Sequence, residues 1–281
     1  MFGILFAKTF FLVGMMLAIT TMTTKINKEY ETGMEALLTF LGSFAFLFAI
    51  SYFDDIFPLN ILLVACFSGI IGWSMGPTIT HIGRRFKLKR FFKARNIKTK
   101  KDTENKDLTI YYKEIESEKY NNEGNLEKAK EVVIADEELE KLLQDFEIEI
   151  NKGGDPYNKK WQDTVFQAML GTTLAVFATA ALVSVSSIDF SFLGMFLLIA
   201  LLLLLAVSLL NFFFFKSSRI SLIKAYFGVL IFTLYLVYDF NMLESQIAQG
   251  ETSWSVAINI AVNIYLDIIN IFLYLLEILA E

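Results

Sequence analysis

Two aspartates stand inside otherwise apolar stretches of this 281-residue chain. Asp239 lies in IFTLYLVYDFNML and Asp267 in INIYLDIINIF. An ionisable group at that depth in a membrane costs several kcal/mol unless it faces protein or water. Two carboxyls held together in such a bundle cannot both ionise cheaply, so we expect them to share a proton and to titrate as a pair. Such a pair is a pH-sensitive latch, or a cation site when both carboxyls are ionised, since carboxylate oxygens suit Ca²⁺.

The spacing alone leaves a second interpretation of Asp239 open. This residue is nearer the end of its apolar stretch, where an acid can simply cap a helix at the membrane interface. Asp267 has apolar residues on both sides for about a dozen positions, which makes an interfacial position less favourable. The two stretches are consecutive, so contact between the two carboxyls is feasible.

The last stretch, residues 253–281, carries further polar residues at helical spacing. Asn259, Asn263, Asp267, Asn270 and Glu277 are separated by four, four, three and seven residues. On a helix with about 3.6 residues per turn, these positions form one stripe. The pattern predicts a membrane helix with a single polar seam, and we consider these residues candidate pore-lining groups beside Asp267.

The composition indicates a polytopic membrane protein. The chain is 55% hydrophobic with a mean hydropathy of +0.50 and contains 28 Phe but only 3 Pro. Cys66 and His81 are the only residues of their types, which excludes an intramolecular disulfide and multi-cysteine or histidine-rich metal sites. The sequence contains no Ser/His/Asp set, no HExxH, no P-loop and no GxGxxG motif. We therefore expect no enzyme activity and no bound cofactor, with Ca²⁺ as a candidate transported ion.

The apolar runs predict an all-α protein with seven transmembrane helices. All are too long for strands and lack period-2 alternation. Their expected bounds are Phe2–Thr24, Met34–Phe53, Phe57–Gly83, Gln162–Ile188, Phe190–Phe215, Ile220–Leu243 and Trp254–Ala280. Inside the third span, Gly76-Pro77 predicts a kink. Gly69, Gly72, Gly76 and Gly171 are expected at close helix contacts.

The chain thus divides into residues 1–83 with three spans, a charged loop at 84–161, and residues 162–281 with four spans. The loop opens with ten Lys or Arg and no acid in residues 84–101. We expect this part to anchor on anionic lipid and not to bind nucleic acid. Within the acidic remainder, Glu127–Ile150 predicts an amphipathic helix or a helical hairpin.

The charges that flank the spans alternate in sign. Acids follow the second, fourth and sixth spans, whereas bases follow the third and fifth. The positive-inside rule therefore places the long loop and the C-terminus in the cytoplasm and the N-terminus outside. The abundance of Lys, Asn, Ile and Phe is typical of bacteria with AT-rich genomes, so we expect a bacterial plasma membrane.

Several segments resemble the Bax inhibitor-1 family of transmembrane proteins. The most specific are AYFGVLIFTLYLVYDFNML (Ala225–Leu243) and NIYLDIINIFLYLLEIL (Asn263–Leu279). The segments Leu5–Thr20, Gly72–His81 and Asp189–Phe214 are similar to other helices of the family. The resemblance covers all seven spans but not the long loop.

The resemblance implies a fold in which the polar seventh helix is central. It also implies a pH-sensitive leak of cations, chiefly Ca²⁺, controlled by the pair Asp239 and Asp267. Two departures from the family stand out. Phe240-Asn241 replaces a Thr-Gln pair, and Asp54-Asp55 occupies a region where bacterial relatives carry basic residues that pair with the acids. The family also has its N-terminus in the cytoplasm, opposite to the orientation that the charges predict.

We therefore carry a main hypothesis and an alternative. The main one is a pH-sensitive Ca²⁺ leak channel or transporter. The alternative is a membrane scaffold or regulator that binds another membrane protein, such as a protease, through the charged loop. An intramembrane aspartyl hydrolase is disfavoured, because Tyr238-Asp239 offers one motif of that class but Leu266-Asp267 lacks the Gly-x-Gly-Asp of the other.

Overall fold

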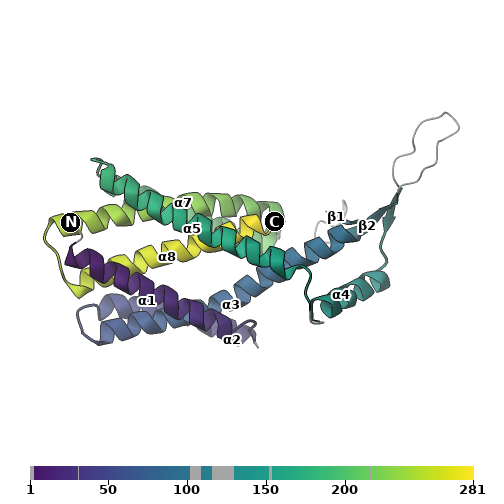
Figure 1. Ribbon diagram of the computed structural model, residues 1–281, viewed down its shortest axis with the longest axis horizontal. Helices are drawn as coiled ribbons and strands as arrows, with labels where there is room; N and C mark the ends of the chain where they lie inside the picture. Colours follow the sequence, from purple (N-terminus) through teal and green to yellow (C-terminus); the bar gives the residue numbers. More distant parts are fainter. Residues whose placement is uncertain (1–2, 31, 102–108, 116–129, 152–153, 216) are drawn as a thin grey trace. The chain divides into compact units, whose positions relative to one another are not determined.

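The structure, a computed structural model, describes residues 3–30, 32–101, 109–115, 130–151, 154–215 and 217–281. Within these ranges seven helices are long and apolar enough to cross a membrane, which confirms the all-α polytopic class (Figure 1). They are α1 (Ile4–Ile26), α2 (Gly33–Tyr52), α3 (Leu59–Ala94), α5 (Asn158–Val185), the span Phe190–Phe215 that contains α6 (Leu193–Leu210), α7 (Ser218–Ala248) and α8 (Trp254–Leu279).

Short polar side chains mark where several helices begin. Thr32 accepts a hydrogen bond from the backbone N–H of Glu35, and Ser253 accepts one from Val256. Each satisfies one of the N–H groups that a helix leaves without an intrahelical partner at its first turn. Both capping residues are exposed, and their hydrogen bonds help to set the ends of α2 and α8.

Helix α8 is the most buried of the seven. Of its most apolar 18 residues, 56% are buried within the protein, against 6% for α2. It packs between α7 and α1 (Figure 1). Ala257 and Ala261, four residues apart and completely buried, keep one face of α8 small. Small residues at this spacing let neighbouring helices approach closely, so the expected central position of this last helix is confirmed.

Two glycines of α3 lie against the C-terminal end of α1. A Cβ atom on Gly72 would lie 1.9 Å from Thr23 Oγ1 and 2.5 Å from the carbonyl oxygen of Thr20. A Cβ atom on Gly76 would lie 1.7 Å from the carbonyl oxygen of Asn27. The expected close-packing role is confirmed at both positions, because backbone atoms cannot move aside as a flexible side chain can.

Helix α3 continues through Pro77. Proline has no N–H, so the carbonyl of the residue four positions earlier, Trp73, loses its helical partner. The side-chain amide of Asn27 donates to this carbonyl over 3.1 Å. The end of α1 thus replaces the bond that Pro77 removes, and this accounts for the burial of Asn27 beside α3.

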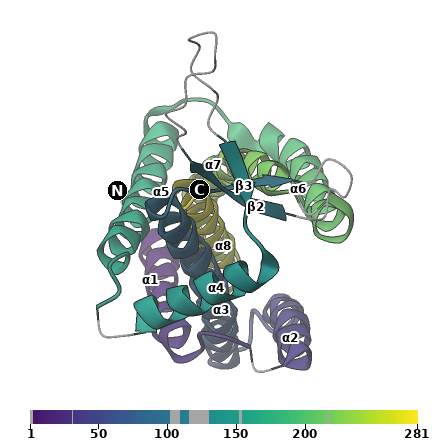
Figure 2. The same ribbon diagram turned by 90° about the vertical axis from the view of Figure 1, so that its right-hand side faces the viewer.

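The chain separates into two compact units, residues 1–82 with 164–281 and residues 83–163. The second unit contains an antiparallel sheet in the order β1 (Ile97–Lys101), β2 (Thr109–Ile115) and β3 (Lys130–Val133), followed by α4 (Asp136–Asn151) (Figure 2). It has its own apolar core. The buried members are Phe91, Phe92, Ile97, Ile134 and Phe146.

Two expectations about the charged loop are wrong in detail. Helix α3 continues past Gly83 to Ala94, because Phe91 and Phe92 have a core of their own to enter. The helix expected over 127–150 begins only at Asp136, whereas the preceding residues 130–133 form β3. Val132 and Val133 favour a strand, and the acids in the first turn of α4 complement its dipole. Residues 127–129 lie outside the described residues.

The basic run is partly neutralised within its own unit. Ion pairs join Arg84 to Glu147, Lys87 to Asp155 and Arg95 to Glu149, at 2.5, 2.5 and 2.9 Å. The pair Arg84–Glu147 is exposed, and such a pair contributes about 0–1 kcal/mol. Lys87 and Asp155 are mostly buried, with side chains 19% and 14% exposed. These ion pairs orient the basic side chains, so that several bases expected to face anionic lipid face acidic side chains instead. Anchoring on lipid stays a prediction.

We expect Gly76→Ala to destabilise the protein by about 1–3 kcal/mol, the usual cost of overpacking, because the new Cβ would meet the backbone of Asn27. Gly14→Ala is the matched control, since nothing lies within 4 Å of a Cβ at that position. Both changes bring the same gain in helix propensity. Thermal unfolding in detergent measures the difference, and equal midpoints for the two variants would contradict the close contact.

Candidate functional site

The structure brings Asp239 of α7 and Asp267 of α8 together. Their side chains are 4% and 5% exposed, and their carboxyl groups are close enough to form a side-chain hydrogen bond with each other. Such a bond requires one of the two carboxyls to be protonated. The Oδ2 atom of each aspartate is buried and has no hydrogen-bond partner among the described residues.

The surroundings of the pair are apolar and aromatic. Leu236 lies three residues before Asp239 on α7, Ile264 lies three residues before Asp267 on α8, and both are completely buried. Tyr235 lies near enough to interact electrostatically with both acids. Next to Asp239, the ring of Phe240 stacks on Phe10 of α1 with centroids 6.1 Å apart. An environment of low polarity strengthens repulsion between like charges. It therefore favours a singly protonated pair over two carboxylates.

The structure does not gather the other seam residues of α8 around this pair. Asn259 and Asn263 are exposed, and Asn270 donates to the carbonyl of Leu266 in its own helix over 2.8 Å. Glu277 accepts a hydrogen bond from Ser221 of α7 at 2.5 Å. Each seam residue described here thus has a local environment of its own, and a pore-lining role for them stays a prediction.

Asp54 contacts the start of α8, which the sequence did not predict. It lies between α2 and α3, and its Oδ2 accepts hydrogen bonds from Ser255 (2.6 Å) and Asn259 (3.2 Å) at the start of α8. Its backbone carbonyl accepts a third from Asn60. The region where the family resemblance implies a base carries an acid bonded to uncharged groups. No local signal could have found a contact between residues about 200 positions apart.

A buried hydroxyl pair joins α1 to α8. Thr20 Oγ1 and Tyr265 Oη are 2.6 Å apart, and the same threonine donates to the carbonyl of Ser68 over 3.1 Å. Tyr265 is completely buried two residues before Asp267. Helices α1, α3 and α8 are therefore joined by polar contacts in the bundle interior, where each satisfied hydroxyl avoids a desolvation cost of about 1–3 kcal/mol.

Asn241, two residues after Asp239, holds the connection between α5 and α6. Its amide nitrogen donates to Asp189 Oδ1 (3.0 Å), and its amide oxygen accepts from the backbone N–H of Phe190 (3.1 Å). The Ser191 side chain and backbone donate to the same carboxylate. These donors, with Ser191 contributing most, lower the pKa of Asp189 below its ordinary value of 3.8.

Protein ligands for a resident metal ion are few. Among the described residues no group of three or more His, Cys, Asp or Glu side chains is placed to hold one. The Asp239–Asp267 pair offers two carboxyls, fewer oxygen ligands than the 6–8 that Ca²⁺ takes. A cation at this pair would keep water or backbone oxygens in its shell, as a passing ion does.

The fold and the site together define a polytopic α-helical membrane protein with a carboxyl pair buried in its bundle. Residues 157–281 match the family described as "Inhibitor of apoptosis-promoting Bax1". Over these residues, 125 of the 281, the chain is similar to the Bax inhibitor-1 family. The matched part includes α7 and α8 and hence both aspartates.

Relatives found by sequence comparison are consistent with the match of residues 157–281 to this family. The chain is 36% identical over 115 residues to the Golgi anti-apoptotic protein of Vaccinia virus (strain Lister), which covers 41% of this chain and 46% of the viral protein. It is 43% identical over 91 residues to Protein LIFEGUARD 4 of Arabidopsis thaliana, covering 32% and 34%. An uncharacterized protein of Campylobacter jejuni is 34% identical over 115 residues, covering 41% and 47%. The chain thus spans about half or less of the length of these relatives.

We expect acid to loosen the connection around Asp189. A lowered pKa means that the ionised carboxylate stabilises the fold above the ordinary value of 3.8 and that this contribution is lost as the pH falls through the lowered pKa. Asn241→Leu removes one donor, so loosening should begin at a higher pH. Pepsin cleavage within residues 186–192, followed between about pH 2 and 4, measures this. Ser187→Ala is the control, and an unshifted Asn241→Leu profile would contradict the assignment.

Proposed function

We propose that this protein is a pH-sensitive cation leak, chiefly for Ca²⁺, controlled by a proton that Asp239 and Asp267 share. One observation carries the proposal, namely two buried carboxyls in contact across α7 and α8, each with an oxygen that no described group satisfies. Acids at such depth are retained in membrane proteins for ion and proton pathways. The similarity of residues 157–281 to the Bax inhibitor-1 family supports the same activity.

The pair provides two states with different contacts. When one carboxyl is protonated, it donates to the other and holds α7 against α8. When both are ionised, they repel each other across a poorly polarisable interior and together attract a divalent cation. A change of pH thus shifts the balance between two arrangements of the same helices. We place the protein in a bacterial plasma membrane with residues 84–161 in the cytoplasm, on the strength of their basic start.

We expect Ca²⁺ flux into proteoliposomes to change across roughly pH 6 to 8, by up to about tenfold per pH unit if one proton controls the gate. Asp267→Asn and Asp239→Asn should remove this pH response, because an amide cannot exchange the shared proton. Asp55→Asn, an exposed acid between α2 and α3, serves as the matched control. Equal flux and equal pH response in all four proteins would refute the gate, and peptide cleavage without flux would indicate a hydrolase.

A second candidate function is a scaffold that binds another membrane protein through residues 83–163. The observation that favours it is that this stretch forms a compact unit with a core of its own. Strand β3 also leaves Val132 and Val133 exposed, and apolar side chains on an edge strand are a common basis for docking.

If the scaffold function holds, a membrane protein that co-purifies with the wild type should be lost when residues 102–155 are replaced by a short Gly-Ser linker. Ca²⁺ flux should be unchanged in that variant, since both aspartates remain. A partner that stays bound to the shortened protein would contradict a role for this unit in docking.

A further inference from the structure

A cavity of about 500 Å³ lies between α1, α5 and α7, and neither Asp239 nor Asp267 is among its lining residues. Its walls are largely apolar, formed by Phe6 of α1, Ala180 of α5, and Leu243 and Ile247 of α7, with Phe240 beside them. The volume is within the range of about 300–1,000 Å³ that is typical of sites for small organic molecules. Size and lining therefore suit a small molecule with an apolar body.

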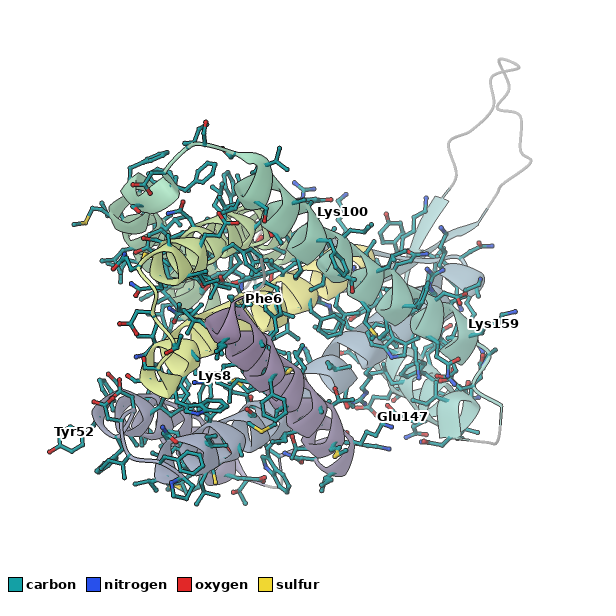
Figure 3. All side chains as sticks on the ribbon, turned by 60° about the vertical axis from the view of Figure 1, so that its left-hand side comes forward. Phe6, Lys8, Tyr52, Lys100, Glu147 and Lys159 are labelled. Atoms are coloured by element: carbon teal, nitrogen blue, oxygen red, sulfur yellow. The ribbon has the colours of Figure 1, made fainter. Side chains whose placement is uncertain are left out.

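The cavity has one charged group. Glu244 of α7 contributes an exposed carboxylate, and Ser184 of α5 adds a hydroxyl. Among the described residues Glu244 makes no hydrogen bond and no ion pair. Lys8, the base on the same stretch of α1 as Phe6 (Figure 3), is engaged elsewhere. It donates to the carbonyl of Thr252 and lies 4.8 Å from the ring centroid of Trp254.

This combination selects among the molecules that an apolar cavity can take. A ligand whose head group carries net negative charge would be repelled by Glu244, and an uncharged hydrocarbon would gain no contact with the carboxylate. An ammonium group satisfies the carboxylate with a charge-assisted hydrogen bond, while its apolar body fills the space beside Phe240 and Leu243. We propose that this cavity is a binding site for an amphipathic amine, with Glu244 as its counter-ion.

One residue of the cavity wall is the sequence neighbour of Asp239. Phe240 borders the cavity, follows Asp239 directly and stacks on Phe10. An occupant would therefore touch the helical turn that carries Asp239 without contacting its carboxyl. The inference concerns binding and does not depend on ion flux, so it holds or fails separately from the proposed leak.

The test uses the full chain in phosphatidylcholine nanodiscs and radiolabelled 4-phenylbutylamine, which is protonated at pH 7. We expect saturable binding above that of empty nanodiscs, and no comparable binding of the uncharged analogue 4-phenylbutanol. Glu244→Gln should weaken binding of the amine about tenfold, the loss of one charge-assisted contact. Ala180→Phe should abolish it by filling the space. Glu251→Gln, an acid between α7 and α8 that does not border the cavity, is the matched control and should bind as the wild type does.

Three results would overturn the proposal. They are no saturable binding to the wild type, equal binding of the amine and the alcohol, or equal binding to Glu244→Gln and wild type in proteins with the same thermal unfolding midpoint. A further arm repeats the measurement in nanodiscs that contain phosphatidylethanolamine. Competition there supports the site with a lipid head group as the source of the ammonium, and its absence supports the site with a free amine.

Discussion

The contact between Asp239 and Asp267 is the interaction that the membrane unit must accommodate. Burying one carboxyl costs free energy, and burying two in contact adds repulsion unless a proton or a cation lies between them. The unit meets this constraint by placing both acids on α7 and α8, the latter being its most buried helix. Because α8 also packs on α1, a change at the acids reaches helices on both sides of it.

Several other buried polar groups of the bundle find partners within the protein, although the Thr9 hydroxyl has none among the described residues. Asn27 supplies the donor that Pro77 withholds from Trp73, and Thr20 and Tyr265 satisfy each other. The unpartnered oxygens of the two aspartates differ from the Thr9 hydroxyl because they belong to ionisable groups that are in contact with each other. Two buried carboxyl oxygens without a donor among the described residues keep capacity for a ligand that comes and goes, such as a proton, a water molecule or a cation.

The unit formed by residues 83–163 is stabilised differently from the membrane unit. Its stability comes from an aromatic core and its surface carries ion pairs, as in a water-soluble domain. The family match begins at residue 157, after almost all of this unit. Its charges also show the limit of reading a basic run by itself, since Arg84 and Arg95 pair with acids of α4 more than 50 residues away.

The sequence by itself determined the class, the seven spans and the two aspartates, because span length and an acid in an apolar run are local properties that the membrane imposes. It also located the close glycines Gly72 and Gly76. Only the tertiary structure decided that the two acids touch and that Asp54 binds the start of α8. It also decided that α3 extends past Gly83 and ends in a separate apolar core. These outcomes depend on pairings between distant residues, such as Asp54 with Ser255, and nothing in either neighbourhood encodes its partner.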